Sequence, residues 1–179
     1  MVVYSATEFI RLPNFNELKQ EINISSSQSF NHSSVYDNVE MILNEDGYIG
    51  YLTLDDKIVA SGFGKEDNSN NPSKYKTMFI HTFSVHSDYR GRGLCQKIVK
   101  EFIKRFGKNY ILYLTVRTES DNVNISAIKC YEKNDFIMLP EVYRDNYDGK
   151  NNAMIRLPTI SKNSIRKRRS RKKTRNKRK

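Results

Sequence analysis

The 179-residue sequence lacks tryptophan, contains two cysteines and four prolines, and has no long apolar run. A helix needs roughly 18–20 consecutive apolar residues to span a bilayer, and no segment approaches that length. The N-terminal residues also lack the basic and apolar regions of a secretory signal. We therefore expect an intracellular protein without a membrane partner. Alanine occurs only four times while asparagine is abundant, a bias typical of A/T-rich coding such as that of a parasite or a large DNA virus.

The small numbers of cysteines and histidines exclude proteins that are held together by a disulfide framework or by zinc sites of typical spacing. Cys95 and Cys130 are too few to make a disulfide framework. Together with His32, His81 and His86 they show no spacing typical of a zinc site, so we expect no metal. The stability of the fold must therefore come from a packed apolar core, for which the chain is long enough.

The charge of the sequence is unevenly distributed. Lys and Arg number 31 against 20 Asp and Glu, which gives a formal net charge of +11. Residues 161–179 hold 12 of the basic residues and no acid, so residues 1–160 keep 19 basic against 20 acidic residues, a net of −1. We expect one near-neutral domain over residues 1–160 and a disordered basic tail over residues 161–179, because dense like charges repel one another.

Residues 1–46 show the weakest pattern of the chain. We expect a first strand over residues 8–12 and a helix over residues 15–24, whose apolar residues are spaced as on one helix face. Residues 25–34 are polar and predict a loop, and apolar residues within 35–43 predict a second short helix.

From residue 48 onward, turn-forming residues separate short apolar segments. Residues 48–54 and 57–63 predict a hairpin that turns at Asp55-Asp56. Gly107 follows a predicted helix, and a left-handed cap is expected there. The remaining expected elements are a polar loop over 65–76, a strand over 78–85, an amphipathic helix over 94–106, an apolar strand over 110–116, a helix over 124–133, and a hairpin of 136–143 and 153–157 around Asp148-Gly149.

The order of these elements predicts the fold class. A strand, a crossover helix and a second strand indicate a parallel pair, here between residues 78–85 and 110–116. The two hairpins indicate antiparallel strands on either side of that pair. We therefore expect an α/β fold with a mixed, mostly antiparallel central sheet, one parallel strand pair and flanking helices.

The most informative segment is the turn over residues 85–95, which joins a strand to a helix through two glycines and two arginines. Backbone N–H groups at a helix start point into one small space, and the helix dipole adds positive potential, so an anion is stabilised there. Gly91 and Gly93 let the backbone approach the anion closely, and Arg90 and Arg92 can add charge-assisted contacts. The spacing fits neither a P-loop nor a dinucleotide fingerprint. We predict a phosphate or pyrophosphate site; a surface turn that needs glycine only for its geometry is the alternative.

The same turn resembles motif A of the GCN5-related N-acetyltransferases (GNAT), Gln/Arg-x-x-Gly-x-Gly/Ala. Arg90 takes the first place and Gly93 the fourth, while Cys95 replaces the final small residue. In that family the turn binds the pyrophosphate of acetyl-CoA through backbone amides. The resemblance implies that the pyrophosphate is bound by Gly91, Arg92, Gly93, Leu94 and Cys95, with Arg90 beside them, and that the pantetheine arm pairs with Phe83, Ser84 and Val85.

A second segment resembles motif B of the family, Asn-x-x-Ala-x-x-x-Tyr-Glu-Lys-x-Gly-Phe. Asp135 replaces the helix-ending glycine, and Asp tolerates the left-handed conformation better than most residues. The resemblance implies that Tyr131 is the general acid for the leaving thiolate and that Asn124 hydrogen-bonds the pantetheine arm. A core aromatic on an amphipathic helix is the alternative for Tyr131. The matching residues are Asn124, Ala127, Tyr131, Glu132, Lys133 and Phe136.

The resemblance covers residues 48–157 and implies a GNAT fold and an acetyl-CoA-dependent N-acetyltransferase. The expected reaction moves an acetyl group to a primary amine, on a small molecule or a protein, by direct attack through a tetrahedral intermediate. Residues 1–46 match only in broad pattern, as the variable acceptor-side segment. They show no motif that identifies the acceptor, and the sequence leaves a monomer and a homodimer equally open.

An acceptor ammonium must lose a proton before it attacks, and His81 is the main candidate for the base. Alternation along the strand is expected to place His81, Phe79 and Phe83 on one face. The position resembles that of a proton-relay histidine in arylalkylamine acetyltransferases. A histidine satisfied within the sheet is the alternative, and Glu66 and Asp67 are weaker candidates for the base.

The tail has three interpretations. Its basic cluster over residues 165–173 is typical of nuclear import or of nucleic-acid tethering by phosphate neutralisation, so a nucleic acid or an import receptor is its expected partner. Its lysines are also candidates for self-acetylation, and a solubilising segment is the third interpretation. A non-catalytic nucleic-acid-binding or packaging protein on the same fold is therefore the alternative to the enzyme.

Overall fold

The computed structural model describes residues 2–29, 37–67, 75–118, 124–144 and 150–159. The strands are β1 (Val2–Ser5), β2 (Tyr48–Leu54), β3 (Lys57–Asp67), β4 (Lys76–Val85), β5 (Tyr110–Arg117), β6 (Ile137–Arg144) and β7 (Lys150–Arg156). The helices are α1 (Ala6–Phe9), α2 (Phe15–Ser29), α3 (Asn38–Asn44), α4 (Leu94–Phe106) and α5 (Ile125–Glu132), with a 3-10 turn at Ser87–Tyr89. In these ranges no helix is long and apolar enough to cross a membrane.

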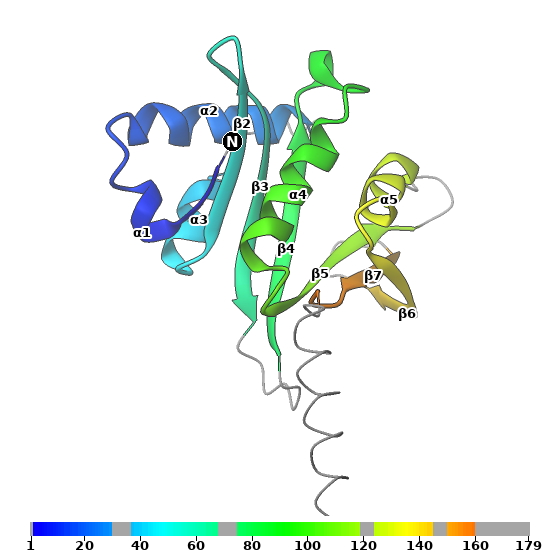
Figure 1. The fold of residues 1–179 in the computed structure, drawn as a ribbon. Coiled ribbons are helices and arrows are strands. Elements are labelled where there is room, and N and C mark those ends of the chain that lie inside the picture. Colours follow the sequence, from blue (N-terminus) through cyan, green and yellow to red (C-terminus); the bar gives the residue numbers. More distant parts are fainter. Residues whose placement is uncertain (1, 30–36, 68–74, 119–123, 145–149, 160–179) are drawn as a thin grey trace, which may run out of the picture.

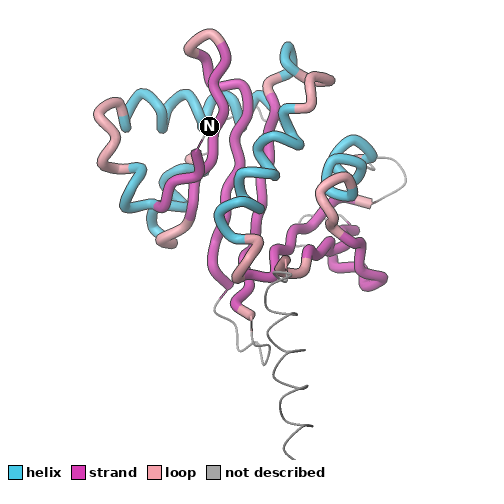
Figure 2. Tube along the Cα trace, viewed as in Figure 1, coloured by secondary structure: helices cyan, strands magenta, loops and turns pink. Residues whose placement is uncertain are grey.

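The strands form one sheet in the order β1-β2-β3-β4-β5-β7-β6. Neighbouring strands are antiparallel except β4 and β5, which are parallel. Helices α4 and α5 lie on one face of the sheet, and α2 crosses the other face (Figures 1 and 2). The predicted fold class is therefore confirmed, including the one parallel pair that the strand–helix–strand order indicated.

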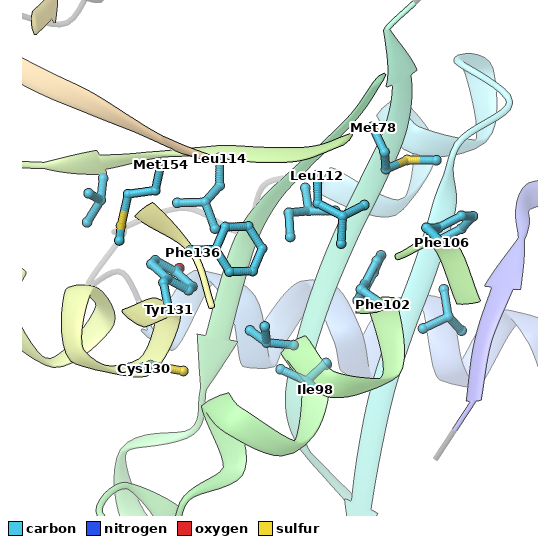
Figure 3. Close-up of a cluster of buried hydrophobic side chains, with 14 residues drawn as sticks. Met78, Ile98, Phe102, Phe106, Leu112, Leu114, Cys130, Tyr131, Phe136 and Met154 are labelled. Carbon is cyan, nitrogen blue, oxygen red and sulfur yellow. The ribbon is translucent and has the colours of Figure 1, made fainter. Parts of the chain in front are cut away.

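The two largest apolar cores among the described residues correspond to the two faces of the sheet. The larger core lies between the sheet and helices α4 and α5, and Figure 3 shows Phe102, Leu114 and Tyr131 among its side chains. A second core joins α1, α2 and α3 to β2 and β3, with Phe9, Ile22 and Phe63 fully buried. Strands β2 and β3 are thus covered on both sides, whereas β5 alternates between buried residues such as Leu114 and exposed residues such as Thr115, unlike a central strand buried on both faces.

The expected strand over residues 8–12 is wrong, because the chain turns into a helix before it. Ser5 and Glu8 form a capping box: the Ser5 hydroxyl accepts from the backbone N–H of Glu8, and the Glu8 carboxylate accepts from the backbone N–H of Ser5. This cap starts helix α1 at Ala6, and the edge strand β1 precedes it. Phe9 is buried in the core on the α2 face rather than paired in the sheet.

Helix α2 is longer than expected, which corrects part of the predicted polar loop over residues 25–34. Residues 25–29 continue the helix, and residues 30–36 lie outside the described part of the chain. Ser25, Ser26 and Ser27 are buried against the sheet, so tertiary packing outweighs the low helix propensity of serine. The predicted second helix is confirmed as α3, which begins after Asp37, whose side chain accepts from the N–H of Glu40.

Gly107 ends α4 as expected but without the left-handed cap, since its φ is −64°. Its backbone N–H donates to the Ile103 carbonyl, and its own carbonyl accepts from the N–H of Thr159. A Cβ on Gly107 would lie only 2.6 Å from the Ile103 oxygen. Glycine is needed here for this close approach, not for a left-handed backbone.

Candidate functional site

Strands β4 and β5 are paired over only part of their length. Residues Lys76–Phe79 of β4 pair with Tyr110–Tyr113 of β5, after which β4 stays with β3 and β5 stays with β7. Figure 1 shows the two strands diverging beyond this point. From residue 80 to Val85, the edge of β4 that faces β5 therefore has no strand partner in the described sheet, and its backbone groups can pair with an extended ligand.

A β-bulge lies in this unpaired part of β4. Ser84 pairs with Ser61 and His81 pairs with Phe63, so Thr82 and Phe83 together stand opposite the single residue Gly62. Thr82 has a φ of +51°, which is uncommon for a β-branched residue and marks local strain.

The bulge corrects the expectation that His81, Phe79 and Phe83 share one face. His81 stacks on Phe79, with ring centroids 5.0 Å apart. Phe83 instead points to the α4 face, where its ring meets Phe102 edge-on at 5.4 Å. The extra residue reverses the alternation of side chains beyond it, and a Cβ on Gly62 would collide with the Phe83 ring at 2.4 Å.

The predicted anion-binding turn lies at the N-terminus of α4. Gly91 and Gly93 have left-handed φ values of 76° and 72°, and a Cβ on either would meet nothing within 4 Å. Gly93 is the N-cap residue of α4 and provides no side-chain hydrogen bond to the helix. In the described part of the chain, the backbone N–H groups of residues 91–95 have no backbone acceptor, so they are available to an anion.

The two arginine side chains of the turn donate hydrogen bonds to nearby backbone carbonyls. The Arg90 Nε donates to the Val85 carbonyl at 3.3 Å, and the Arg92 Nη2 donates to the Asp88 carbonyl at the same distance. The Arg92 guanidinium also lies over the Tyr89 ring, 5.1 Å from its centroid. Both guanidinium groups stay at the exposed rim of the turn. Leu94 is buried beside Val59 and Ala60, with Val85 packed against the same cluster.

Tyr131 is buried in the core of the α4 face. Its ring lies 6.1 Å from the rings of both Phe83 and Phe136. Burial raises the pKa of Tyr131 to about 12, so the phenol stays protonated at neutral pH. Tyr131 is a member of the main apolar cluster of this face.

The two other predicted cofactor contacts each have a structural role as well. The Asn124 side chain caps α5 by accepting from the N–H of Ala127 at 3.0 Å, and the residue is exposed. The Ser84 hydroxyl shares a buried hydrogen bond of 2.7 Å with that of Ser61, which fixes β4 to β3 beside the bulge.

A disulfide joins Cys95 and Cys130, which the sequence analysis did not pair. Cys95 lies in the first turn of α4, and Cys130 directly precedes Tyr131 on α5. The bridge therefore links the helix of the anion-binding turn to the helix of the buried phenol. A separation of 35 residues between two cysteines carries no sequence signal for pairing.

His81 lies on the face opposite Tyr131, beside the point where β4 and β5 separate. Its Nδ1 is 2.9 Å from the Thr82 hydroxyl oxygen. Desolvation lowers the pKa of His81 to about 4, so the imidazole is neutral at pH 7; Glu45 has a smaller effect that raises this pKa, and Lys65 one that lowers it. A neutral imidazole can accept a proton.

The other candidates for the base are engaged elsewhere. Glu66 and Asp67 lie at the far end of the sheet, where they accept hydrogen bonds from the hydroxyls of Tyr110 and Tyr113. His86 accepts from the backbone N–H of Asp88 and helps to shape the turn. Over the described ranges, no group of three His, Cys, Asp or Glu side chains could hold a metal ion.

Comparison with known proteins agrees with this geometry. The family model "Acetyltransferase (GNAT) family" matches residues 15–136. No curated protein matches the sequence. Among solved structures, the aminoglycoside 6'-N-acetyltransferase from Enterococcus faecium is similar, with a TM-score of 0.67, 14% identity, and coverage of 90% of this chain and 100% of that one.

Two further structures show the same likeness. The ribosomal-protein-S18-alanine N-acetyltransferase from Escherichia coli has a TM-score of 0.61 at 17% identity, covering 90% of this chain and 97% of that one. An aminoglycoside 6'-N-acetyltransferase solved with coenzyme A has a TM-score of 0.65 at 14% identity, covering 90% and 100%. At these identities the likeness concerns the fold.

Proposed function

The chain belongs to the GNAT acetyltransferase family, and from this premise we propose that it moves an acetyl group from acetyl-CoA to a primary amine, by direct attack through a tetrahedral intermediate. The observation that carries the proposal is the turn before α4, where two left-handed glycines leave open space in front of free backbone N–H groups. This arrangement suits a pyrophosphate, since the helix dipole and the N–H groups act on the same small volume.

The residues around the turn fit the rest of such a donor. The backbone of Phe83, Ser84 and Val85 has a free edge toward β5, which can hydrogen-bond the amides of a pantetheine arm. Arg90 and Arg92 add positive charge at the rim of the turn. Acetyl-CoA would supply the activated acetyl thioester, and the chain would hold it in the space between the diverging strands.

Tyr131 is the proposed general acid. When the amine has attacked the thioester carbonyl, the carbon–sulfur bond breaks and the sulfur leaves with the electron pair of that bond. A protonated phenol can give its proton to the sulfur, and burial keeps the Tyr131 phenol protonated. The Tyr131 ring lies 6.1 Å from the ring of Phe83, which belongs to β4, the strand that we propose binds the pantetheine arm.

His81 is the proposed general base. A neutral imidazole can take the proton that the acceptor ammonium must lose before it attacks. His81 and Tyr131 lie on opposite faces, so the separation of β4 from β5 is what would let both act on one acceptor–donor pair. The base would receive the amine from the α2 face while the acid serves the thioester from the α4 face.

The test combines binding and turnover. Acetyl-CoA should raise the melting temperature of the full chain, and release of free thiol should require both acetyl-CoA and an amine. The amines should include a polyamine, an aminoglycoside, a peptide with a free N-terminus and a lysine peptide, because the structural relatives act on both small molecules and proteins. The proposal would be contradicted if acetyl-CoA did not raise the melting temperature and if no amine led to release of free thiol.

A variant of the turn provides the matched control. Gly93→Val should abolish the stabilisation by acetyl-CoA, because a β-branched residue is strained at a φ of 72° and its side chain occupies the open space. The melting temperature of the unliganded variant reports any effect on folding separately. Full stabilisation of this variant by acetyl-CoA would place the donor elsewhere.

A further inference from the structure

The side chains of Thr82 and His81 meet although the two residues are neighbours in β4. The Thr82 hydroxyl oxygen is 2.9 Å from His81 Nδ1. In a regular strand, neighbouring side chains point to opposite faces of the sheet, so this contact would not form. The left-handed backbone of Thr82, with a φ of +51°, is what brings the two together. The bulge therefore delivers a hydroxyl group to the histidine that we propose as the general base.

Threonine is an unfavourable residue for this backbone conformation. A β-branched side chain is strained at positive φ, whereas glycine, asparagine and aspartate adopt it at lower cost. Among the described residues, the other non-glycine residues with positive φ are all aspartates, namely Asp46, Asp55, Asp56 and Asp135. Strained residues of this kind cluster at functional sites. The polar group that threonine supplies here is its hydroxyl, which points to a role for that group beside His81.

The aromatic neighbours of His81 fix the plane of its ring but not its orientation within that plane. The Phe79 ring stacks on it, with centroids 5.0 Å apart and an interplanar angle of 13°. The Phe63 ring of β3 lies 6.0 Å away. A phenyl ring packs equally well when the imidazole flips, which exchanges Nδ1 with a carbon. The hydrogen bond to Thr82 removes this freedom, because a flipped ring would place a carbon against the hydroxyl.

The same hydrogen bond bears on which ring nitrogen can take a proton. In a neutral imidazole one nitrogen donates and the other accepts, and the partner of one nitrogen sets the state of the other. A threonine hydroxyl can accept the Nδ1–H group, which leaves the lone pair on Nε2. Once Nε2 has taken a proton, the Nδ1–H group of the charged ring can still donate to the hydroxyl, and charge-assisted hydrogen bonds are the stronger ones.

We propose that Thr82 is a positioning residue for acetyl transfer: its hydroxyl accepts from the Nδ1–H group of His81 and so keeps Nε2 free to take the proton of the acceptor ammonium. An N–H bond of the ammonium breaks, its electron pair stays on the amine nitrogen for attack on the thioester carbonyl, and the proton binds to the lone pair of Nε2. This inference rests on the proposed function, in which His81 is the base. Thr82 acts through His81 and not on the reacting atoms.

The first experiment observes the tautomer by NMR in the full chain without any ligand. Nitrogen chemical shifts distinguish a protonated from an unprotonated ring nitrogen, and the signals lost in His81→Gln are those of His81. At neutral pH the parent should carry the proton on Nδ1. Thr82→Val keeps the branched shape without the hydroxyl and should shift the proton toward Nε2, whereas Thr82→Ser should keep the tautomer of the parent. A proton on Nε2 in the parent, or an unchanged tautomer in Thr82→Val, overturns the proposal.

The second experiment measures steady-state kinetics with an amine that supports turnover. Thr82→Val should lower kcat by roughly 10- to 100-fold, as expected for a lost hydrogen bond to a charged group, while acetyl-CoA still raises the melting temperature. Thr82→Ser should recover most of kcat. The control, Thr77→Val, removes a hydroxyl of β4 that donates to the Asp67 carbonyl at 2.9 Å, and should keep the kcat of the parent. Equal kcat in Thr82→Val and the parent, or equal losses in Thr82→Ser and Thr82→Val, would contradict the role of the hydroxyl.

Thr82→Gly separates positioning from folding. Glycine adopts a φ of +51° without strain, so this variant should resist urea at least as well as the parent. Its kcat should nevertheless fall as in Thr82→Val, because the hydroxyl is absent. A glycine variant with the full kcat of the parent would overturn the proposal even if Thr82→Val failed to fold.

Failure of this inference differs from failure of the proposed function. A parent that transfers acetyl groups while Thr82→Val does so equally well keeps the enzyme and removes Thr82 from the mechanism. A parent that neither binds acetyl-CoA nor turns over any amine removes the enzyme together with the proton transfer from the acceptor. In that case the chemical shifts of His81 still decide whether the hydroxyl holds its tautomer.

Discussion

Two parts of the fold carry opposite charge. Residues 2–67, which form α1 to α3 and β1 to β3, contain 4 basic and 11 acidic residues, a net of −7. Residues 75–118, which form β4, α4 and β5, contain 9 basic and 2 acidic residues, a net of +7. The near-zero charge of the body thus hides a polarised molecule. An anionic donor is favoured at α4, and a cationic group is favoured on the side of α2.

The same two sides divide the proposed chemistry. Tyr131 belongs to the face of α4, where burial keeps a phenol protonated, and His81 belongs to the face of α2, where burial keeps an imidazole neutral. Each group is held in the protonation state that its proposed role needs. The bulge at Thr82 is the feature that separates the faces locally, because it sends His81 to one side and Phe83 to the other.

The largest effect is expected when the proposed general acid on the α4 side, Tyr131, is removed. Tyr131→Phe should lower kcat by roughly 10²- to 10⁴-fold while the affinity for acetyl-CoA stays nearly unchanged, because only the proton of the phenol is lost. Tyr110→Phe is the matched control, since the Tyr110 hydroxyl is bound to Glu66 at the other end of the sheet. Steady-state kinetics and acetyl-CoA titration measure both quantities. Equal turnover of Tyr131→Phe and Tyr110→Phe removes the phenol from the mechanism.

The second test removes the disulfide between helices α4 and α5. Cys130→Ser removes the disulfide to Cys95 and should lower the free energy of unfolding by roughly 2–4 kcal/mol, because the bridge closes a loop of 35 residues in the unfolded chain. Urea unfolding with and without reductant gives the measurement. Reductant should destabilise the parent chain and leave the variant unaffected; equal stability of the oxidised and reduced parent would show that the bridge contributes nothing.

The third test addresses the α2 side through pH. The pKa of His81 is about 4 in the fold and near 6.5 when unfolded, so the unfolded chain takes up a proton first as the pH falls. The stability from this group is complete above pH 6.5 and should decrease by up to about 3 kcal/mol as the pH approaches 4. His81→Gln should flatten this dependence in urea unfolding at several pH values.

The same variant tests the base. The ascending limb of the pH–rate profile near pH 4 should disappear in His81→Gln, because the group that must be deprotonated is gone. A profile identical to that of the parent would end the role of His81 in catalysis. A flattened stability curve with an unchanged rate profile would identify His81 as a buried structural histidine.

The smallest effect is expected at the end of α5. Asp135 has a φ of +66°, and its weak ion pair with Arg156 spans 3.9 Å. Asp135→Gly should raise the free energy of unfolding by roughly 0.5–1 kcal/mol, because glycine adopts this conformation without strain. Chemical unfolding checks this. Asp135→Ala is the control and should destabilise, since alanine has the same steric strain without the local hydrogen bonding of Asp.

Sequence patterns predicted the structure correctly where it depends on residues that are close together in the chain. Helix α4 begins and ends where its apolar spacing indicated, and Asp135 adopts the left-handed conformation expected of a residue that replaces the helix-ending glycine of motif B. The hairpin of β2 and β3 turns at Asp55-Asp56 as expected. The failures have two causes. The capping box of Ser5 and Glu8, which replaces the strand expected at residues 8–12, is a local Ser-x-x-Glu pattern that the apolar spacing does not reveal. The close approach at Gly107 instead involves Thr159, which is far away in the sequence.

The sequence by itself determined the mixed sheet, because periodicity and turn residues are local properties of the chain, and its resemblance to two short motifs indicated the family. Only the tertiary structure decided that Cys95 and Cys130 pair, that the bulge at Thr82 puts His81 and Phe83 on opposite faces, and that the N–H of Thr159 meets the carbonyl of Gly107. Each of these depends on which residues far apart in sequence come together in the fold, and no local pattern contains that information.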